Sequence, residues 1–245
     1  MYVPYCGAPP HPGELLTRFN LDPVLIVALA LLAWVHWRLA RNSRERALAV
    51  GGWAIAAVAF ISPLCALSVS LFSARITQHM ILLLLAAPLI AAAWPKPASD
   101  GRTWPLWLAA GIFFVALWFW HMPGPYDATF DSTSIYWSMH VTLFGSGILL
   151  WRELLQHRRL CTGDALVVAL LSSMQMSLLG AVLTLATRPL FFWHLNTTAA
   201  WGYTPLQDQQ LGGVIMWVPG MVLFLWASIR SLRRLGLALD EVKPT

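Results

Sequence analysis

The chain has 245 residues, of which 58% are hydrophobic and only 11% are charged, whereas about 25% of residues are charged in ordinary soluble proteins. This composition excludes a soluble globular domain and indicates an all-α, polytopic membrane helical bundle. The net charge of +5 does not indicate a nucleic-acid partner, because the basic residues flank hydrophobic segments and therefore report membrane topology. The partner that the composition does indicate is the lipid bilayer.

Hydropathy divides the chain into three parts. Residues 1–20 form an extracytoplasmic segment, 21–234 a transmembrane domain and 235–245 a cytoplasmic tail. The first segment lacks a basic region and a small-residue cleavage site, so we expect no removable signal peptide. At about 20 apolar residues per span, the hydropathy predicts seven transmembrane helices. In chain order they cover about 21–40, 47–71, 74–94, 104–121, 135–151, 165–187 and 211–230. After the fourth span, we expect Pro123 and Pro125 to form a turn that carries Tyr126 and Asp127.

Positive charge alternates along the connections between the predicted spans. Thirteen Lys and Arg residues follow the first, third, fifth and seventh spans, and the other three are Arg18, Arg75 and Arg188. Cytoplasmic loops are enriched in Lys and Arg. We therefore expect a multi-pass protein of the cell membrane, with the N-terminus outside and the C-terminus in the cytoplasm.

The three cysteines form no recognisable motif. Cys6, Cys65 and Cys161 are too far apart in the sequence for a CxxC or zinc-binding pattern. On spacing alone, we therefore expect neither a disulfide framework nor a thiolate metal cluster.

Four histidines on different segments are predicted to lie near the outer membrane face: His79, His121, His140 and His194. Three of them have a methionine next to them in the sequence: Met80, Met122 and Met139. Imidazole and thioether ligands together suit copper, and the thioether favours Cu(I) in particular. An outer-face site would receive copper that arrives from the periplasm, so the pattern suggests copper binding.

The histidines are better candidates for metal ligands than the methionines. A single histidine at a span end usually bonds water or a carbonyl group, but the convergence of His79, His121 and His140 favours a shared site. Adjacent helical residues point about 100° apart, so His79 and Met80 cannot both face one ion without distortion. We therefore take the three histidines as candidate ligands and the three methionines as soft auxiliary donors.

The sixth predicted span carries small and hydroxyl residues on one helical face: Ser173, Ser177, Gly180, Thr184 and Thr187. Such a stripe indicates close helix packing. The alternative interpretation is the polar wall of a cavity that is reached from outside.

The last predicted span opens with polar residues. Asp208, Gln209 and Gln210 stand where the chain re-enters the membrane, and an acid at a helix N-terminus caps free N–H groups. Capping does not account for the two glutamines. Gln209, Gly212 and Met216 share one helical face, so we expect this face to line the site.

Five sequence blocks occur in the order "ISPLCALSVSLFS", "QHMILLLLAAPLI", "WFWHMPGPYDATF", "MHVTLFGSGILLW" and "TPLQDQQLGGVIMWVPG". Together they resemble the polytopic, seven-span CtaG family of cytochrome c oxidase assembly factors over about residues 47–230. The resemblance implies a role in maturing the heme-copper oxidase, by delivering copper to its catalytic copper centre or by forming that centre. The implied partners are oxidase subunits and periplasmic copper chaperones.

By position, the features of the family fall on His79, His121, Tyr126, Asp127, His140, Asp208, Gln209, Gln210 and Met216. The chain also departs from the family pattern. Arg75 and Ile76 stand where a histidine and a methionine often precede the Q-H pair, and Met139 and Cys65 stand where acids are frequent. Met139 and Cys65 could compensate as soft donors and favour Cu(I), with His194 as a further lining residue. Alternatively, the chain has lost metal binding and kept a scaffold role.

Two other classes of function stay open. A membrane electron carrier would bind heme through two histidines, but the candidates lie near one interface and are not spaced to stack two hemes across the bilayer. A transporter or scaffold would have an outer cavity that binds no metal. An enzyme is not indicated, because the sequence has no nucleophile with a positioned base, phosphate-binding loop or HExxH motif.

Overall fold

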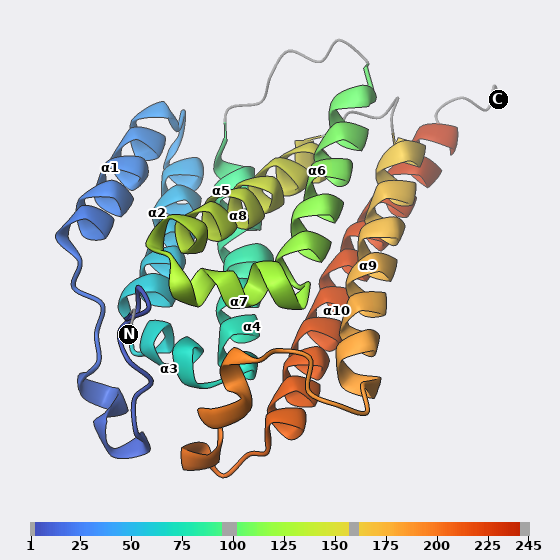
Figure 1. Cartoon of the computed structure of the whole chain (residues 1–245). Coiled ribbons are helices and arrows are strands. Elements are labelled where there is room, and N and C mark those ends of the chain that lie inside the picture. Colours follow the sequence, from blue (N-terminus) through green and yellow to red (C-terminus); the bar gives the residue numbers. More distant parts are fainter. Residues whose placement is uncertain (1–2, 95–101, 157–161, 241–245) are drawn as a thin grey trace.

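A computed structural model describes residues 3–94, 102–156 and 162–240, and the regular elements in these ranges are all helical. The helices form a bundle in which the α9–α10 pair lies beside the remaining helices (Figure 1). The elements are η1 (Pro12–Thr17), α1 (Pro23–Leu39), α2 (Ser43–Ile61), α3 (Leu64–Ser70), α4 (Phe72–Met80), the π-helix η2 (Ile81–Ala86), α5 (Ala87–Ala93), α6 (Trp104–Trp120), α7 (Pro123–Asp131), α8 (Thr133–Gln156), α9 (Thr162–Leu185), η4 (Trp193–Asn196), η5 (Ala199–Trp201) and α10 (Pro205–Asp240).

Several of these helices are suited to a membrane. Three helical stretches in the described ranges are long and apolar enough to cross it: Phe72–Ala93, Gly163–Leu185 and Pro205–Arg233. The number rises to five if two bent pairs, α2 with α3 and α6 with α7, each form one span. Helix α1 is apolar but shorter, and α8 coincides with the predicted fifth span. The helices support a membrane protein, and the full set of seven spans stays a prediction.

The predicted second span is broken by a proline. Helix α2 ends at Ile61, and α3 begins at Leu64 with its axis bent by 47°. Pro63 has no N–H to continue the helical ladder, and the preceding Ser62 is extended, at φ −66° and ψ 168°, as residues before proline tend to be. The bend turns α3 into the end of the bundle that holds the N-terminal segment (Figure 1).

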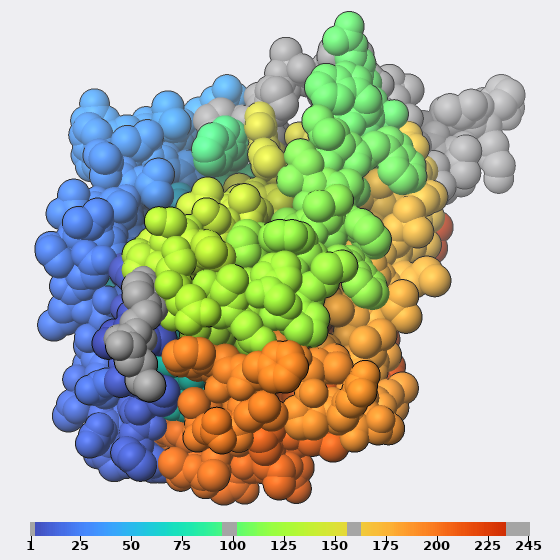
Figure 2. Space-filling model, viewed as in Figure 1, coloured from blue at the N-terminus to red at the C-terminus, as the bar shows by residue number. Residues whose placement is uncertain are grey.

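The second bend contradicts a sequence-based expectation. Pro123 and Pro125 suggested a turn that carries Tyr126 and Asp127, yet residues Pro123–Asp131 form helix α7, inclined by 73° to α6. Proline is tolerated in the first turn of a helix, where its missing N–H would have no intrahelical acceptor. On the face shown in Figure 2, α7 and the connection between α9 and α10 lie against each other and cover the elements behind them.

Helices α9 and α10 pack closely through small residues. A Cβ atom on Gly180 would lie 2.8 Å from the Cβ of Trp217 and 2.9 Å from the carbonyl oxygen of Gly213. Thr184 donates its hydroxyl to the carbonyl of Gly180 at 2.8 Å. At these positions, the small residues of the predicted sixth span serve helix packing, the first of the two interpretations.

Asp208 connects α10 to α4. Its buried carboxylate accepts the backbone N–H groups of Phe72 at 2.6 Å and Ser73 at 3.1 Å, together with the Ser73 hydroxyl. The sequence predicted capping of its own helix, but Asp208 caps the N-terminus of a helix more than 130 residues earlier in the chain. A carboxylate is favourable at that position because it complements the helix dipole. This contact positions the helix that carries His79.

The two glutamines bind the end of α9. The Gln209 side chain accepts the N–H of Leu190 at 2.7 Å and donates to the carbonyl of Leu183 at 3.3 Å. Gln210 donates to the carbonyl of Ala186 at 3.2 Å. The last carbonyl groups of a helix have no partner within the helix, so these glutamines satisfy groups that would otherwise lack one.

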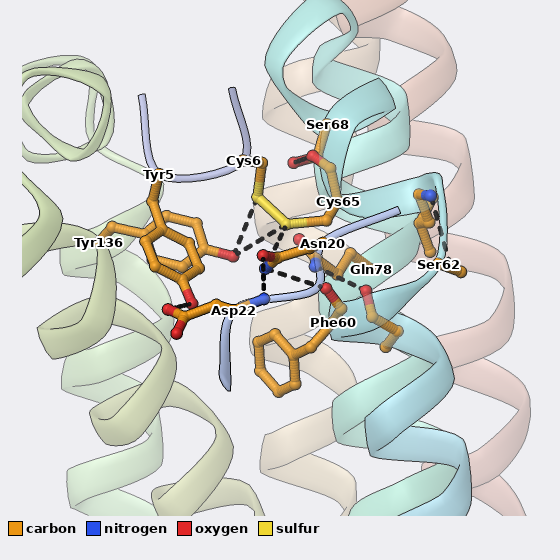
Figure 3. The surroundings of a disulfide bond; sticks show 12 residues. Tyr5, Cys6, Asn20, Asp22, Phe60, Ser62, Cys65, Ser68, Gln78 and Tyr136 are labelled. Atoms are coloured by element: carbon orange, nitrogen blue, oxygen red, sulfur yellow. Dashed lines mark hydrogen bonds between the residues drawn. A yellow bond between two sulfur atoms is a disulfide. The ribbon is translucent and has the colours of Figure 1, made fainter. Parts of the chain in front are cut away.

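Cys6 and Cys65 form a disulfide bond, with a Cα–Cα distance of 5.4 Å (Figure 3). The expectation of no disulfide was therefore wrong. The two residues are 59 positions apart in the sequence, and spacing along the chain does not report which distant segments the fold brings together. The third cysteine, Cys161, lies outside the described residues.

Candidate metal site

Three of the predicted histidines meet inside the bundle. His79 comes from α4, His121 follows the last residue of α6, and His140 comes from α8. The ring centroid of His79 lies 5.5 Å from that of His121 and 5.4 Å from that of His140. The three side chains are at most 3% exposed. The structure thus brings together the three histidines that the sequence grouped.

The nitrogens of these rings are unusual in their hydrogen bonding. Nδ1 of His121 lies 2.7 Å from the carbonyl of Leu117, and Nδ1 of His140 lies 3.0 Å from that of Tyr136. A carbonyl accepts only from a protonated nitrogen, so Nε2 of each ring carries the lone pair. In the described chain, these two Nε2 atoms and both nitrogens of His79 have no hydrogen-bond partner.

Unpartnered nitrogens in a protein interior are costly unless they have a ligand-binding role. Buried polar atoms nearly always have a partner, and burial without one costs about 1–3 kcal/mol. The four nitrogens belong to His79, which has two of them, and to His121 and His140, which have one each. His79 and His140 line a small pocket together with Leu82, Leu83, Leu143 and Phe144. In a neutral imidazole one nitrogen carries a lone pair, so each of the three rings has one lone pair that is chemically suited to a metal ion.

The spacing fits an ion shared by two imidazoles. With metal–nitrogen bonds of about 2.0 Å, two such rings would have centroids at most roughly 6 Å apart, and both distances from His79 lie within this limit. In their present orientations, however, no three His, Cys, Asp or Glu side chains of the described residues are arranged to hold a metal ion. A third histidine would join the site only after rotation of side chains.

The three methionines differ in position. Met139, beside His140, is fully buried, and Met80 is 5% exposed, whereas Met122 is 50% exposed. Met122 is therefore the least suited of the three to a buried site. Directly after Met80 the helix becomes the π-helix η2. Such a segment changes the direction of the side chains that follow it and is frequent at functional sites.

Arg75 lies one helical turn before His79 and is 1% exposed. Its guanidinium carbon lies 4.6 Å from the ring centre of Phe130 and 5.3 Å from that of Tyr136, and its Nε donates to the carbonyl of Ser68 at 3.5 Å. Within the described chain, its Nη1 group has no hydrogen-bond partner. The residue that replaces a possible ligand is therefore a buried positive charge beside the histidines.

His194 belongs to a separate, hydrogen-bonded network. Its Nε2 lies 2.8 Å from the hydroxyl of Tyr126, and its Nδ1 lies 3.3 Å from both the carbonyl of Ser70 and the hydroxyl of Thr197. Burial, and to a lesser extent the charge of Arg75, lowers the pKa of His194 to about 3. Both nitrogens have partners, so His194 does not share the property that marks the other three histidines.

Other predicted lining residues have partners elsewhere in the fold. Asp127 accepts the N–H groups of Phe192 at 3.1 Å and Trp193 at 3.3 Å, which attaches α7 to the α9–α10 connection. Met216 is fully buried in the core. Cys65 is oxidised, so in this state it has no thiolate to offer a metal, and the predicted compensation by a soft cysteine donor is not available.

Tyr136 was missed by the sequence interpretation. Its hydroxyl lies 3.4 Å from the sulfur of Cys6 and 3.8 Å from that of Cys65, while its ring centre lies 4.3 Å from that of His140. The ring of Tyr5 stacks on that of Tyr136, as Figure 3 shows. A spacing of four residues from His140 places both side chains on one helical face, which was the available signal. Tyr136 connects the disulfide to the histidine site.

One comparison with known proteins, the match to a family model, agrees with the resemblance found in the sequence. No match to this chain was found among curated proteins or among solved structures. The family model of the cytochrome c oxidase caa3 assembly factors matches residues 29–235. This range begins within α1 and ends within α10, so it includes the histidine site and the contacts that position it. The chain therefore belongs to the cytochrome c oxidase caa3 assembly factor family (Caa3_CtaG).

Proposed function

We propose that this protein assists the assembly of cytochrome c oxidase by binding copper as cargo at His79, His121 and His140 and passing it on to the copper centre of the oxidase. The observation that carries the proposal is the set of buried imidazole nitrogens without partners in the described chain. Imidazole is a donor that copper accepts, and the thioether of the buried Met139 would favour Cu(I). The role is that of a non-catalytic metallochaperone.

The three histidines have different parts in this proposal. The carbonyls of Leu117 and Tyr136 hold the rings of His121 and His140 through Nδ1, which presents Nε2 as the metal-binding atom. Neither nitrogen of His79 is held by a hydrogen bond in the described residues. Its ring is therefore the easiest of the three to turn toward or away from an ion. A carrier must release its cargo, and one unrestrained ligand makes exchange easier.

The proposal places the site near the outer face of a seven-span protein in the bacterial cell membrane. Two independent observations support an N-terminus outside. Lys and Arg residues alternate as the positive-inside rule requires, and Cys6 in the N-terminal segment is disulfide bonded, which is typical of oxidising compartments outside the cytoplasm. Tyr136 connects that disulfide to His140. Copper would then come from periplasmic chaperones and go to oxidase subunits.

The test is the Cu(I) content of the purified full-length protein. We expect one bound Cu(I) in the wild type, loss of that ion in His79→Ala, His121→Ala and His140→Ala, and no loss in His194→Ala. His194 is the matched control because it is equally buried but has hydrogen bonds at both nitrogens. Unchanged copper content in the first three variants would reject the site. A visible spectrum of the same samples would reveal heme, the mark of an electron carrier.

A metal-free scaffold is the second candidate function. The observation in its favour is that no three potential ligands of the described residues are arranged around one point. The scaffold predicts that a variant with His79, His121 and His140 all changed to alanine still supports oxidase assembly in cells that lack the wild-type protein. The copper-carrier proposal predicts that this variant is present in the membrane but leaves the oxidase without activity.

A further inference from the structure

Arg75 is a buried cation that the proposed function does not use. It precedes His79 by four residues on the same helix, which places the two Cβ atoms about 6 Å apart on one face. Its side chain is 1% exposed. The guanidinium group of arginine is positively charged in proteins. A full positive charge therefore lies one helical turn from the candidate ligands.

The surroundings of Arg75 do not neutralise this charge. Its guanidinium lies over the rings of Phe130 and Tyr136 and donates to a carbonyl, while Nη1 has no hydrogen-bond partner within the described chain. The buried carboxylate of Asp208 lies at the start of the same helix, but it accepts from Phe72 and Ser73. A buried charge in this position is expensive, and its presence indicates a function.

The histidine site itself brings no compensating charge. An imidazole that binds a metal is neutral, and so is the thioether of Met139. An ion at the site therefore interacts with Arg75 as two like charges in a medium with little screening. The repulsion on Cu(II) is twice that on Cu(I), because it is proportional to the charge of the ion. Arg75 thus weakens the binding of both states, and weakens Cu(II) binding more.

We propose that Arg75 makes the histidine site selective for Cu(I) over Cu(II), as a positioned charge rather than as a ligand. The inference rests on the proposed copper-binding function and adds the residue that discriminates Cu(I) from Cu(II). It also gives a reason for an arginine at a position where a metal ligand would otherwise be useful: the charge excludes the oxidised ion and makes the bound Cu(I) easier to release.

Packing is the alternative role for Arg75, since contacts of a cation with aromatic rings also stabilise a fold. The guanidinium connects α4 to Phe130 of α7 and Tyr136 of α8. A purely structural role predicts a lower thermal stability after substitution. It does not predict that the two oxidation states of copper respond differently, and this difference separates the two roles.

The experiment compares Arg75→Met, which removes the charge but keeps an apolar stem, with Arg75→Lys, which keeps the charge. Arg152→Met is the matched control, because Arg152 also lies over a tryptophan ring, at 5.9 Å, and has an unpartnered Nε in the described chain. It follows His140 by twelve residues on α8, a distance of about 18 Å along the helix. For each full-length protein, Kd is measured for Cu(I) and for Cu(II) by competition with chromophoric chelators.

In Arg75→Met we expect the ratio of the Cu(II) Kd to the Cu(I) Kd to fall roughly tenfold or more, equal to a reduction potential lower by about 59 mV for one electron. Arg75→Lys and Arg152→Met should stay within about threefold of the wild type. If Arg75→Met does not fold, Arg75→Gln removes the charge while keeping a donor for Ser68.

Two outcomes overturn the inference while leaving copper binding intact. The first is an unchanged ratio in Arg75→Met or Arg75→Gln, and the second is an equal shift in Arg75→Lys, which would mean that geometry rather than charge matters. A wild-type protein that binds no Cu(I) would instead overturn the proposed function, and the inference with it.

Discussion

His194 and the three clustered histidines are buried to a similar depth, yet the two regions differ in their hydrogen bonds. His194 has partners at both nitrogens, one of them the hydroxyl of Tyr126. In the cluster, the Nε2 atoms of His121 and His140 and both nitrogens of His79 have no hydrogen-bond partner within the described chain. Burial is common to both regions. Only the unpartnered lone pairs therefore separate a candidate ligand from a structural histidine.

Copper affinity should show the largest difference between the regions. Loss of a residue that only hydrogen-bonds to a metal ligand already costs about 10–100-fold in metal affinity. Removal of a direct ligand in His140→Ala should therefore weaken Cu(I) binding by about 100-fold or more. His194→Ala should stay within about threefold. Competition titration with a chromophoric Cu(I) chelator measures both, and equal losses in the two variants would remove the distinction.

For the stability of the copper-free protein, substitution of His194 should have a larger effect than substitution in the cluster. His194→Ala leaves the hydroxyl of Tyr126 without its partner and removes a buried imidazole from the core, so we expect it to lower the free energy of unfolding by about 2–3 kcal/mol. His79→Leu removes two nitrogens that are unpartnered in the described residues, and we expect less than about 1 kcal/mol or a gain. Thermal unfolding in detergent compares the two. A larger loss in His79→Leu would show that its nitrogens have partners after all.

Acidification tests the buried state of His194 when the wild type is compared with a variant at this position. Its pKa is about 3 in the folded state and about 6.5 in an unfolded chain, so between these values the unfolded state binds more protons. Stability therefore decreases as pH falls below 6.5. From pH 7 to 5 the contribution of this residue amounts to about 2 kcal/mol. Between pH 7 and pH 5, the free energy of unfolding should therefore change by about 2 kcal/mol less in His194→Gln than in the wild type. Unfolding curves of both proteins at the two pH values measure this difference. The same pH dependence in both proteins would contradict a buried, neutral imidazole.

The smallest effect concerns the hydroxyl groups beside the two regions. Tyr126→Phe removes the partner of His194 Nε2 and should cost about 1–1.5 kcal/mol of stability. Tyr136→Phe removes a hydroxyl whose sulfur contacts are 3.4 and 3.8 Å long, and its cost should be about 0.5 kcal/mol or less because sulfur is a weak partner. Matched unfolding curves of the two variants measure the difference. Equal costs would mean that the His194 network is no stronger than the contact with the disulfide.

The helix boundaries were well predicted where apolar residues run without interruption. The predicted spans 74–94 and 104–121 correspond to Phe72–Ala93 and Trp104–Trp120. Prediction failed at prolines: the expected turn at Pro123 begins a helix, and the second span bends at Pro63. A proline restricts the local backbone, but whether the chain then turns, bends or starts a helix depends on what packs against it.

The site was predicted in outline, and its details were not. Grouping His79, His121 and His140 needed only their depth and the side of the membrane, which hydropathy and charge supply. The same reasoning placed His194 with them and treated Cys65 as a possible donor. It did not predict that His194 is hydrogen bonded to Tyr126 or that Cys65 is bonded to Cys6. Those partners are 68 and 59 positions away.

By itself the sequence determined the membrane class, the approximate helices and the three histidines at a common depth. These properties depend on composition and on neighbours along the chain, because hydropathy and helical spacing are local. Only the tertiary structure decided that Asp208 caps α4, that Cys6 is oxidised with Cys65, and that Arg75 is buried beside His79. Hydrogen-bond partners and charge neighbours are chosen across the fold, and they decide which imidazole nitrogens remain available to bind an ion.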